Sequence, residues 1–306
     1  MDVSIIIPTY NRLWSLPKAV SSCFDPSLKI EVIVIDDGSM DGTWEWLGKQ
    51  QNIIAIHQSN AGKDWAVNKG FAIATGKYIR FLDSDDWILA NSTYQLFVEA
   101  EEKQSDIVCA GYQSFDENEK FIKETPWTIC DDFLAQQLGE CDSSHYSAYL
   151  FKKDFIKDIP HRQEFGALDD RQFVIETAMN VPKTSYISSA TLAHRVHKNE
   201  RLQNISGLTE TAVHLARLNI YKKCFRTLEA KGLLTQRRKS AACNNLWHLA
   251  HWVAKTHLHD AREIYNWVYE LDPDFKPREN IGIARLYKKI GFSNTEKLLR
   301  FRRLFT

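Results

Sequence analysis

The feature that most constrains the fold is a repeated alternation of short apolar runs with amphipathic segments in the first part of the chain. The apolar runs are Val3–Ile7, Glu31–Ile35, Ile53–His57 and Tyr78–Leu82. Runs of this length, mostly apolar and without a regular alternation of polar positions, are typical of buried strands, and strand–helix–strand units place such strands in parallel. The sequence therefore predicts an α/β fold with a mostly parallel sheet flanked by helices. A strand pair over Asp106–Phe115 and Phe121–Glu124 is expected to follow.

A second pattern, of helices only, begins near Gln203–Gly207. Apolar residues recur there at helical spacing in three stretches, Thr209–Ala230, Thr235–Thr256 and Asp260–Leu271. We therefore expect a first domain of residues 1–204 and an all-helical C-terminal region of residues 205–306.

Composition excludes several classes of function. Lys+Arg and Asp+Glu number 39 each, so we expect no nucleic-acid partner. The 6 cysteines include no CxxC pair, which favours buried free thiols over a zinc site or a disulfide framework. Val3–Ile7 leads directly into a turn without a signal-peptide pattern, and no apolar run is long enough to span a bilayer. A cytoplasmic location is the expectation.

The C-terminal tail, Ile283–Phe305, is basic, with Glu296 as its single acidic residue and apolar residues interleaved among the basic ones. This pattern fits a helix that lies on an anionic membrane, which would make the protein peripheral to that membrane. The alternative, which we prefer, is a solvated, partly packed pair of terminal helices.

Polar, turn-forming residues follow three of the predicted strands, at Pro8–Asn11, Asp36–Ser39 and Asp83–Asp86. The carboxyl ends of parallel strands meet at one edge of a sheet, where ligands of such folds bind. Carboxylates gathered there need a cation or a donor-rich ligand, and Asp83-x-Asp85 can present two of them to Mg²⁺ or Mn²⁺. An ordinary solvated acidic turn is the alternative.

Several segments together resemble the family 2 glycosyltransferases of GT-A fold. They are Ser4–Arg12, Val34–Ser39 with Asp41–Thr43, Gly76–Asp86, and the intervening Asn60–Gly62 and Ala66–Gly70, in which Val67 stands where arginine is usual. The resemblance covers roughly the first two thirds of the chain. It implies a Rossmann-like GT-A domain and an inverting transfer of sugar from a nucleotide diphosphate sugar to a hydroxyl acceptor. Residues 1–115 would bind the donor and residues 116–204 the acceptor, which could be a glycan or a lipid-linked one.

The resemblance also implies roles for the residues of the nucleotide pocket. Pro8, Thr9 and Tyr10 would edge this pocket, and Asp37 would accept from a base N–H, which suits a UDP-sugar. Tyr10 could instead pack on the sheet. For Asp36 we expect a structural role, in which its carboxylate holds the following turn.

The same resemblance makes Asp85 the main ligand of Mn²⁺ or Mg²⁺, with Asp83 facing both the ribose and the metal. The segment His194–His197 resembles one that often closes the site in this family, so His197 could be a further metal ligand and Arg195 could contact the diphosphate. A surface or packing role is the alternative for both residues.

The catalytic base of this family lies in an acidic pair at a helix start. Phe165–Phe173 is similar to that element, although Asp169 stands in the more usual glutamate position. We expect Asp170 to be the base and Asp169 to orient it or to contact the acceptor. The alternative is an ordinary helix start, since acidic residues favour the first turn.

Three other functions were weighed. A nucleotidyltransferase usually has a glycine-rich loop where Pro8–Asn11 stands, and a Rossmann dehydrogenase is disfavoured because no GxGxxG follows Ile7. A non-catalytic subunit that binds sugar nucleotides is the remaining alternative, and the set of Asp37, Asp83, Asp85 and Asp170 argues against it.

Overall fold

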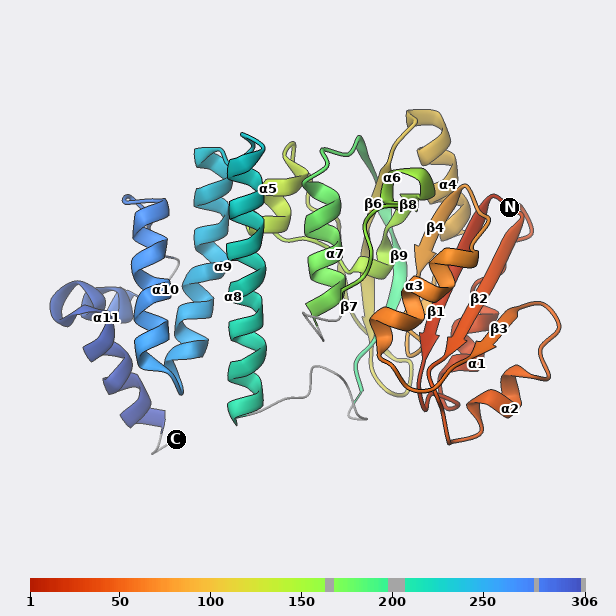
Figure 1. Ribbon diagram of the computed structural model, residues 1–306, viewed down its shortest axis with the longest axis horizontal. Coiled ribbons are helices and arrows are strands. Elements are labelled where there is room, and N and C mark those ends of the chain that lie inside the picture. Colours follow the sequence, from red (N-terminus) through yellow and green to blue (C-terminus); the bar gives the residue numbers. More distant parts are fainter. Residues whose placement is uncertain (163–167, 198–206, 278–280, 304–306) are drawn as a thin grey trace. The chain divides into compact units, whose positions relative to one another are not determined.

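The computed structural model describes residues 1–162, 168–197, 207–277 and 281–303 (Figure 1). The chain divides into two compact units, one made of Met1–Ile129 with Ser143–Arg201 and the other of Cys130–Asp142 with Leu202–Thr306. The predicted boundary near residues 203–207 falls almost entirely outside the described residues and stays a prediction. The sequence did not indicate that residues 130–142 belong with the helical unit.

The first unit is built on a sheet whose first half is parallel. Strands β1 (Val3–Thr9), β2 (Ile30–Asp36), β3 (Ile54–His57) and β4 (Tyr78–Phe81) are the four predicted ones. They lie side by side in the order β3-β2-β1-β4, and each pair is parallel. Nearly all side chains of β1, β2 and β4 are buried, which explains why these runs lack alternating polar positions.

The second half of the sheet is mixed. It contains β5 (Trp87–Ile88), β6 (Ile107–Phe115), β7 (Phe121–Thr125), β8 (Leu150–Lys152) and β9 (Thr184–Arg195). Strand β8 joins β4 to β6 by antiparallel pairing, and β6 continues to β9 in parallel. The expected strand pair is confirmed, because β6 and β7 are antiparallel neighbours. The α/β prediction is therefore confirmed, although the sequence pattern did not indicate the antiparallel strands β5 and β8.

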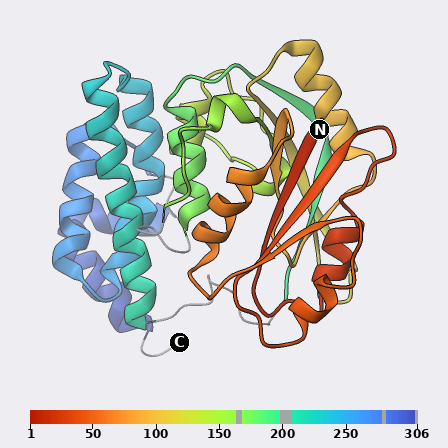
Figure 2. The same cartoon turned by 45° about the vertical axis from the view of Figure 1, so that its right-hand side comes forward.

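Helices flank this sheet (Figure 2). They are α1 (Leu16–Ser21), α2 (Thr43–Leu47), α3 (Lys63–Ile73), α4 (Ser92–Lys103), α6 (Lys153–Ile156) and α7 (Asp169–Ala178), with a 3₁₀ turn η1 (Tyr146–Ala148). Helix α3 packs on β1 and β2 so closely that a Cβ at Gly70 would lie 2.6 Å from Ile6 Cγ2. Ser15 is the N-cap residue of α1, but its side chain does not cap the helix. Its hydroxyl donates instead to the carbonyl of Ser84, 2.8 Å away.

Arg80 of β4 is fully buried and fastens the two halves of the sheet together. Its guanidinium donates to Thr93 Oγ1 at 2.8 Å and to the carbonyl of Thr191 at 2.7 Å, which connects β4 to α4 and β9. Burial lowers the pKa of Arg80 to about 10, which still leaves the side chain charged at neutral pH. The strand that leads to the Asp83–Asp86 segment is therefore rigidly anchored.

The second unit is helical, as predicted. It contains α5 (Phe133–Leu138), α8 (Gly207–Ala230), α9 (Gln236–Ala254), α10 (Leu258–Leu271) and α11 (Ile281–Arg303). Helix α5 is tied to α9 by Asn245 Nδ2, which donates to the carbonyl of Leu138 at 2.8 Å. In the part of the chain that the structure describes, no helix is long and apolar enough to cross a membrane.

The basic tail forms α11, which is interrupted at Gly291, where φ is 77°. Tyr287 and Phe292 are buried, and Phe292 stacks on Tyr265 of α10 with ring centroids 4.6 Å apart. The buried Glu296 bonds His251 of α9 at 2.6 Å. The tail is thus a partly packed helix pair, which was one of the two interpretations of its sequence.

Candidate active site

The carboxyl ends of β1, β2 and β4 meet at one edge of the sheet, as predicted. The register places Thr9 of β1 beside Asp36 of β2, and β4 runs parallel to β1 on its other side. The loops that follow these strands, residues 10–13, 37–43 and 82–86, therefore leave the sheet in the same direction.

The first two of these loops are joined to each other by hydrogen bonds between backbone and side chain. The Asn11 N–H donates to Ser39 Oγ at 2.8 Å, and the Met40 N–H donates to Asn11 Oδ1 at 2.8 Å. Asp41 accepts the N–H of Leu13 at 3.0 Å. Asn11, Ser39 and Asp41 thus hold the two loops together at this edge of the sheet.

Asp37 is 4% exposed and holds the next loop. One carboxylate oxygen accepts Gln58 Nε2 at 2.7 Å and the Ala61 N–H at 2.9 Å, and the other accepts the Gly62 N–H at 2.9 Å. Part of its accepting capacity is therefore used within the protein. A direct contact between Asp37 and a nucleobase stays a prediction.

The structural role expected for Asp36 is confirmed. Its carboxylate accepts the N–H of Ser39 at 3.3 Å and lies 2.6 Å from His57 Nδ1. Asp36 is fully buried, so it holds the turn from beneath and does not face a ligand.

Pro8, Thr9 and Tyr10 lie at the end of β1 beside these loops. Pro8 and Thr9 are buried, whereas Tyr10 is 40% exposed. The ring of Tyr10 is therefore accessible to a base, but base contact by any of the three residues stays a prediction.

Asp83, in the loop after β4, forms an ion pair with Lys63 at the start of α3. Asp83 Oδ1 lies 2.5 Å from Lys63 Nζ, and both side chains are about three-quarters buried. Burial alone would raise the pKa of Asp83. The positive charge of Lys63, together with His145 and His194, outweighs it and lowers this pKa to about 2. Burial disfavours the charge of Lys63, but Asp83 and Asp170 raise its pKa above the ordinary value. Asp83 is thus anionic and Lys63 cationic at neutral pH.

Asp85 lies beside His197, the residue predicted to share a metal with it. Asp85 Oδ2 is 3.0 Å from His197 Nε2 and 4.0 Å from Arg12 Nε. The ring of Trp14 contacts the His197 ring edge-on, with centroids 5.0 Å apart. The structure therefore brings the two candidate ligands together, while Asp83 is held separately by Lys63. Metal binding by these three residues stays a prediction.

Arg195, at the end of β9, is largely engaged within the protein. Its Nε donates to the carbonyl of Asp85 at 3.0 Å, and its Nη2 pairs with Glu119 at 3.1 Å. The guanidinium lies over the rings of Trp87 and Trp14, 4.8 and 5.6 Å from their centroids. Trp87 is itself buried. Contact between Arg195 and a diphosphate stays a prediction.

Two adjacent carboxylates begin α7, and their surroundings differ. Asp169 is 4% exposed and accepts from His161 Nδ1 and from the Arg162 N–H, the latter at 2.7 Å. The other ring nitrogen of His161 bonds the Tyr146 hydroxyl at 2.9 Å. Asp169 is therefore held by a buried chain of hydrogen bonds.

Asp170 is only partly buried, and its carboxylate accepts the N–H of Arg171 at 2.7 Å. Its negative charge helps to raise the pKa of Lys63, so Asp170 lies near the ion pair of Lys63 and Asp83. The glycine-containing part of the predicted motif, residues 165–167, lies outside the described residues. Asp170 is thus the more accessible member of the pair, and its role as a base stays a prediction.

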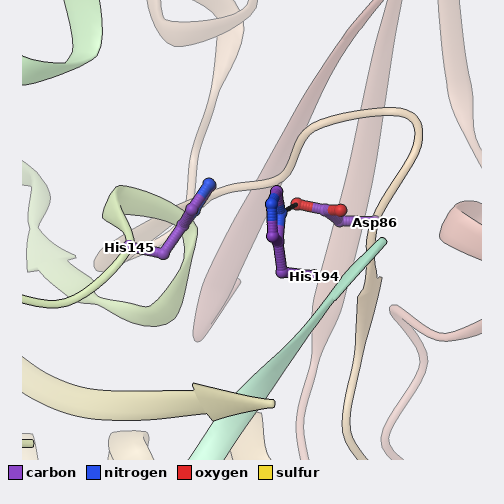
Figure 3. Close-up of side chains that lie close together, drawn as sticks. All are labelled: Asp86, His145 and His194. Carbon is purple, nitrogen blue, oxygen red and sulfur yellow. Dashed lines mark hydrogen bonds and ion pairs between the residues drawn. The ribbon is translucent and has the colours of Figure 1, made fainter. Parts of the chain in front are cut away.

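A further cluster lies next to Asp83 and consists of Asp86, His145 and His194 (Figure 3). One ligand atom from each lies within 4.8 Å of the other two. The imidazole rings of His145 and His194 have centroids 4.9 Å apart. The sequence alone provided no reason to assign a ligand role to Asp86 or His145.

Lys63, Trp14, His161 and the Asp86 cluster were missed by the sequence interpretation. Apart from His161, whose partner Asp169 is 8 residues away, these residues have partners far away along the chain, as His145 is from His194. Only His194 carried a local signal, because it belongs to the His194–His197 segment. Spacing within one segment could not reveal the others.

Comparison with known proteins agrees with this geometry. Residues 4–157 match the sequence model of the family described as glycosyl transferase family 2. Relatives include glycosyltransferase GlyA of Streptococcus pneumoniae, 36% identical over 122 residues, which are 38% of this chain and 18% of GlyA. Uncharacterized glycosyltransferase EpsJ of Bacillus subtilis is 27% identical over 188 residues, 58% of this chain and 55% of EpsJ. The chain thus spans little more than half of EpsJ and much less of GlyA.

Solved structures of S. aureus TarS, residues 1–349, have a similar fold. The structure in complex with UDP-GlcNAc matches with a TM-score of 0.56 and 18% identity, over 89% of this chain and 91% of that chain. The structure in complex with UDP gives the same TM-score and identity, over 98% and 91%. At this identity the likeness shows the GT-A fold.

Proposed function

The chain belongs to glycosyl transferase family 2, and from this premise we propose that it transfers a sugar from a nucleotide diphosphate sugar to a hydroxyl acceptor. The observation that carries the proposal is the single acidic edge at the carboxyl ends of β1, β2 and β4, where Asp37, Asp83 and Asp85 gather. Such an edge suits a donor whose phosphates come with a cation. Residues 1–115 would bind the donor and residues 116–204 the acceptor.

A UDP-sugar is the proposed donor. The structures of similar fold were solved with UDP-GlcNAc and with UDP, which supports a uridine diphosphate. The arrangement of Pro8, Thr9 and Tyr10 beside Asp37 is compatible with a flat pyrimidine base. Arg195, Lys63 and Arg12 are cations beside the acidic edge that could contact a diphosphate.

A divalent cation is the proposed cofactor. Asp85 and His197 fit Mn²⁺ or Mg²⁺ because a carboxylate oxygen and an imidazole nitrogen lie 3.0 Å apart, and the nitrogen favours Mn²⁺. Asp83 would complete the set after separating from Lys63. When bound, the cation neutralises negative charge on the leaving diphosphate.

The proposed reaction is a single displacement with inversion. The acceptor hydroxyl oxygen attacks the anomeric carbon, its proton passes to the Asp170 carboxylate, and the bond to the diphosphate oxygen breaks. Asp169 would act as a positioning residue, since His161 and the Arg162 N–H already occupy its carboxylate.

The acceptor is proposed to be a glycan or a lipid-linked molecule. Leu298 and Phe301 of α11 are 54% and 63% exposed beside the exposed Lys297, which supports a peripheral contact with an anionic membrane.

The experiment that tests the proposed function is calorimetric titration with UDP and a panel of UDP-sugars in the presence of Mn²⁺. We expect binding that weakens at least tenfold in Asp85→Ala and stays unchanged in Asp25→Ala, a partly exposed acid in the turn that precedes β2. Unchanged UDP affinity in Asp85→Ala would remove Asp85 from the site. Failure of every UDP compound to bind would overturn the donor assignment.

A further inference from the structure

Asp86, His145 and His194 come from three segments that are distant along the chain. Asp86 follows β4, His145 immediately precedes η1, and His194 lies near the end of β9. Figure 3 shows the carboxylate of Asp86 directed toward the His194 ring, and the His145 ring on the opposite side of His194. The fold therefore gathers one carboxylate and two imidazoles without help from local sequence.

The cluster has a rigid base. Asp86 is 1% exposed, and one of its oxygens accepts the Arg195 N–H at 2.8 Å while the other lies 3.1 Å from His194 Nδ1. A buried carboxylate held by a backbone N–H keeps its position when a ligand arrives. His145 and His194 are only partly buried, so an ion can reach them from solvent.

The rings can supply nitrogen ligands. His145 Nδ1 receives only a long contact from the Ser147 N–H, at 3.3 Å, so little is lost if this ring turns. An ion bound between His194 and Asp86 would replace the proton that they share, because a metal binds an unprotonated imidazole nitrogen. With all three ligand atoms within 4.8 Å, small side-chain rotations bring them to coordination distance.

We propose that Asp86, His145 and His194 form a binding site for a first-row transition ion, Zn²⁺ in particular. Two imidazoles and one carboxylate are a donor set that such ions prefer, whereas Mg²⁺ prefers oxygen ligands throughout. The bound ion fastens the loop after β4 to β9 and to the segment before η1, and it thereby steadies the edge that carries Asp83.

This site is separate from the one proposed for Mn²⁺ or Mg²⁺. Asp85 pairs with His197, whereas the neighbouring Asp86 pairs with His194 and the Arg195 N–H. The two acid–imidazole pairs use different residues throughout. The Zn²⁺ proposal therefore does not rest on the proposed function.

His259, Asp260 and Glu263 also lie close enough to hold an ion. They belong to a single helix, α10, and His259 and Glu263 are exposed. Because Zn²⁺ added in solution could bind there, the reference protein for the test is the full chain without a histidine tag and with His259→Ala.

The test is a Zn²⁺ titration of this reference protein and of three variants made in it, followed by metal analysis after dialysis. We expect one equivalent of Zn²⁺ that persists in Asp85→Ala, a variant that also removes any Zn²⁺ held by Asp85 and His197. His145→Ala and His194→Ala should each weaken its binding at least tenfold. Zn²⁺ should also raise the melting temperature of the reference protein but not that of the two histidine variants.

Two results would overturn the proposal. One is loss of the equivalent in Asp85→Ala with retention in both histidine variants. The other is displacement of Zn²⁺ by excess Mg²⁺, which would indicate an oxygen-rich site. If an alanine variant fails to fold, His145→Gln keeps the size of the side chain but is a much poorer ligand, and the same loss of Zn²⁺ is expected.

Discussion

Substitution of aspartate by asparagine should have different effects at Asp169 and at Asp170, the two carboxylates at the start of α7. Asp170→Asn removes a proton acceptor from a partly buried side chain, whereas Asp169→Asn alters a carboxylate buried between two donors. One change should therefore affect transfer and the other the stability of the fold.

The expected size of each effect follows from the hydrogen bonds. In Asp170→Asn the new amide oxygen can still accept the Arg171 N–H, so the free energy of unfolding should change by less than about 0.5 kcal/mol. Loss of a general base lowers the transfer rate about 10²–10⁴-fold. In Asp169→Asn an amide NH₂ must face either the His161 ring or the Arg162 N–H. One charge-assisted hydrogen bond is then lost, at a cost of about 1.5–3 kcal/mol.

The assay compares three quantities in both variants. The first is the rate at which UDP is released from the UDP-sugar that binds best, measured with acceptor sugars and with water as the acceptor. The second is the affinity for UDP, and the third is the urea concentration at the midpoint of unfolding. UDP affinity should stay nearly unchanged in Asp170→Asn. A fully active Asp170→Asn beside a stable but inactive Asp169→Asn would refute the reasoning and move the base one residue upstream.

Three other predictions follow from buried or exposed groups. Burial opposes the charge of Glu31, but hydrogen bonds from Ser4, Thr75 and the Gly76 N–H outweigh it and lower its pKa from 4.5. A lowered folded pKa stabilises the protein above the unfolded value, and the benefit disappears as pH falls through the folded pKa. Glu31→Gln should therefore lower the free energy of unfolding by about 1–3 kcal/mol at pH 7, with a difference that shrinks below pH 4.5 in urea titrations. Lys63→Met and Asp83→Asn should show a coupling energy of about 2 kcal/mol at pH 7 in a double-mutant cycle, since the pKa of Asp83 is lowered from 3.8 to about 2. Additive effects would show that the ion pair contributes nothing. Leu298→Ser combined with Phe301→Ser should reduce co-sedimentation with anionic vesicles, and equal sedimentation would exclude a membrane contact through this face.

Much of the architecture could be predicted because its signal is local. Strands β1, β2 and β4 lack alternating polar positions since both faces of their sheet are covered, and the C-terminal helices repeat apolar residues at helical spacing. The antiparallel β8 and the short β5 were missed because two or three residues carry too little pattern to identify a strand.

The sequence by itself determined the acidic edge. Parallel strands that end in Asp36–Ser39 and Asp83–Asp86 must present these residues on the same side of a sheet, whatever the details of packing. That Asp85 and His197 lie close together was also predicted, but this prediction depended on the resemblance to a known family.

Only the tertiary structure decided which partner each of these side chains has. In the folded chain Asp83 forms an ion pair with Lys63, and Asp37 accepts hydrogen bonds from the N–H groups of Ala61 and Gly62. Two histidines lie beside Asp86. These partners lie tens of residues apart, and whether two such groups meet depends on how helices and loops pack on the sheet. The sequence determines the charge and the donor and acceptor groups of each side chain, but the packing of the folded chain determines which partner each of them has.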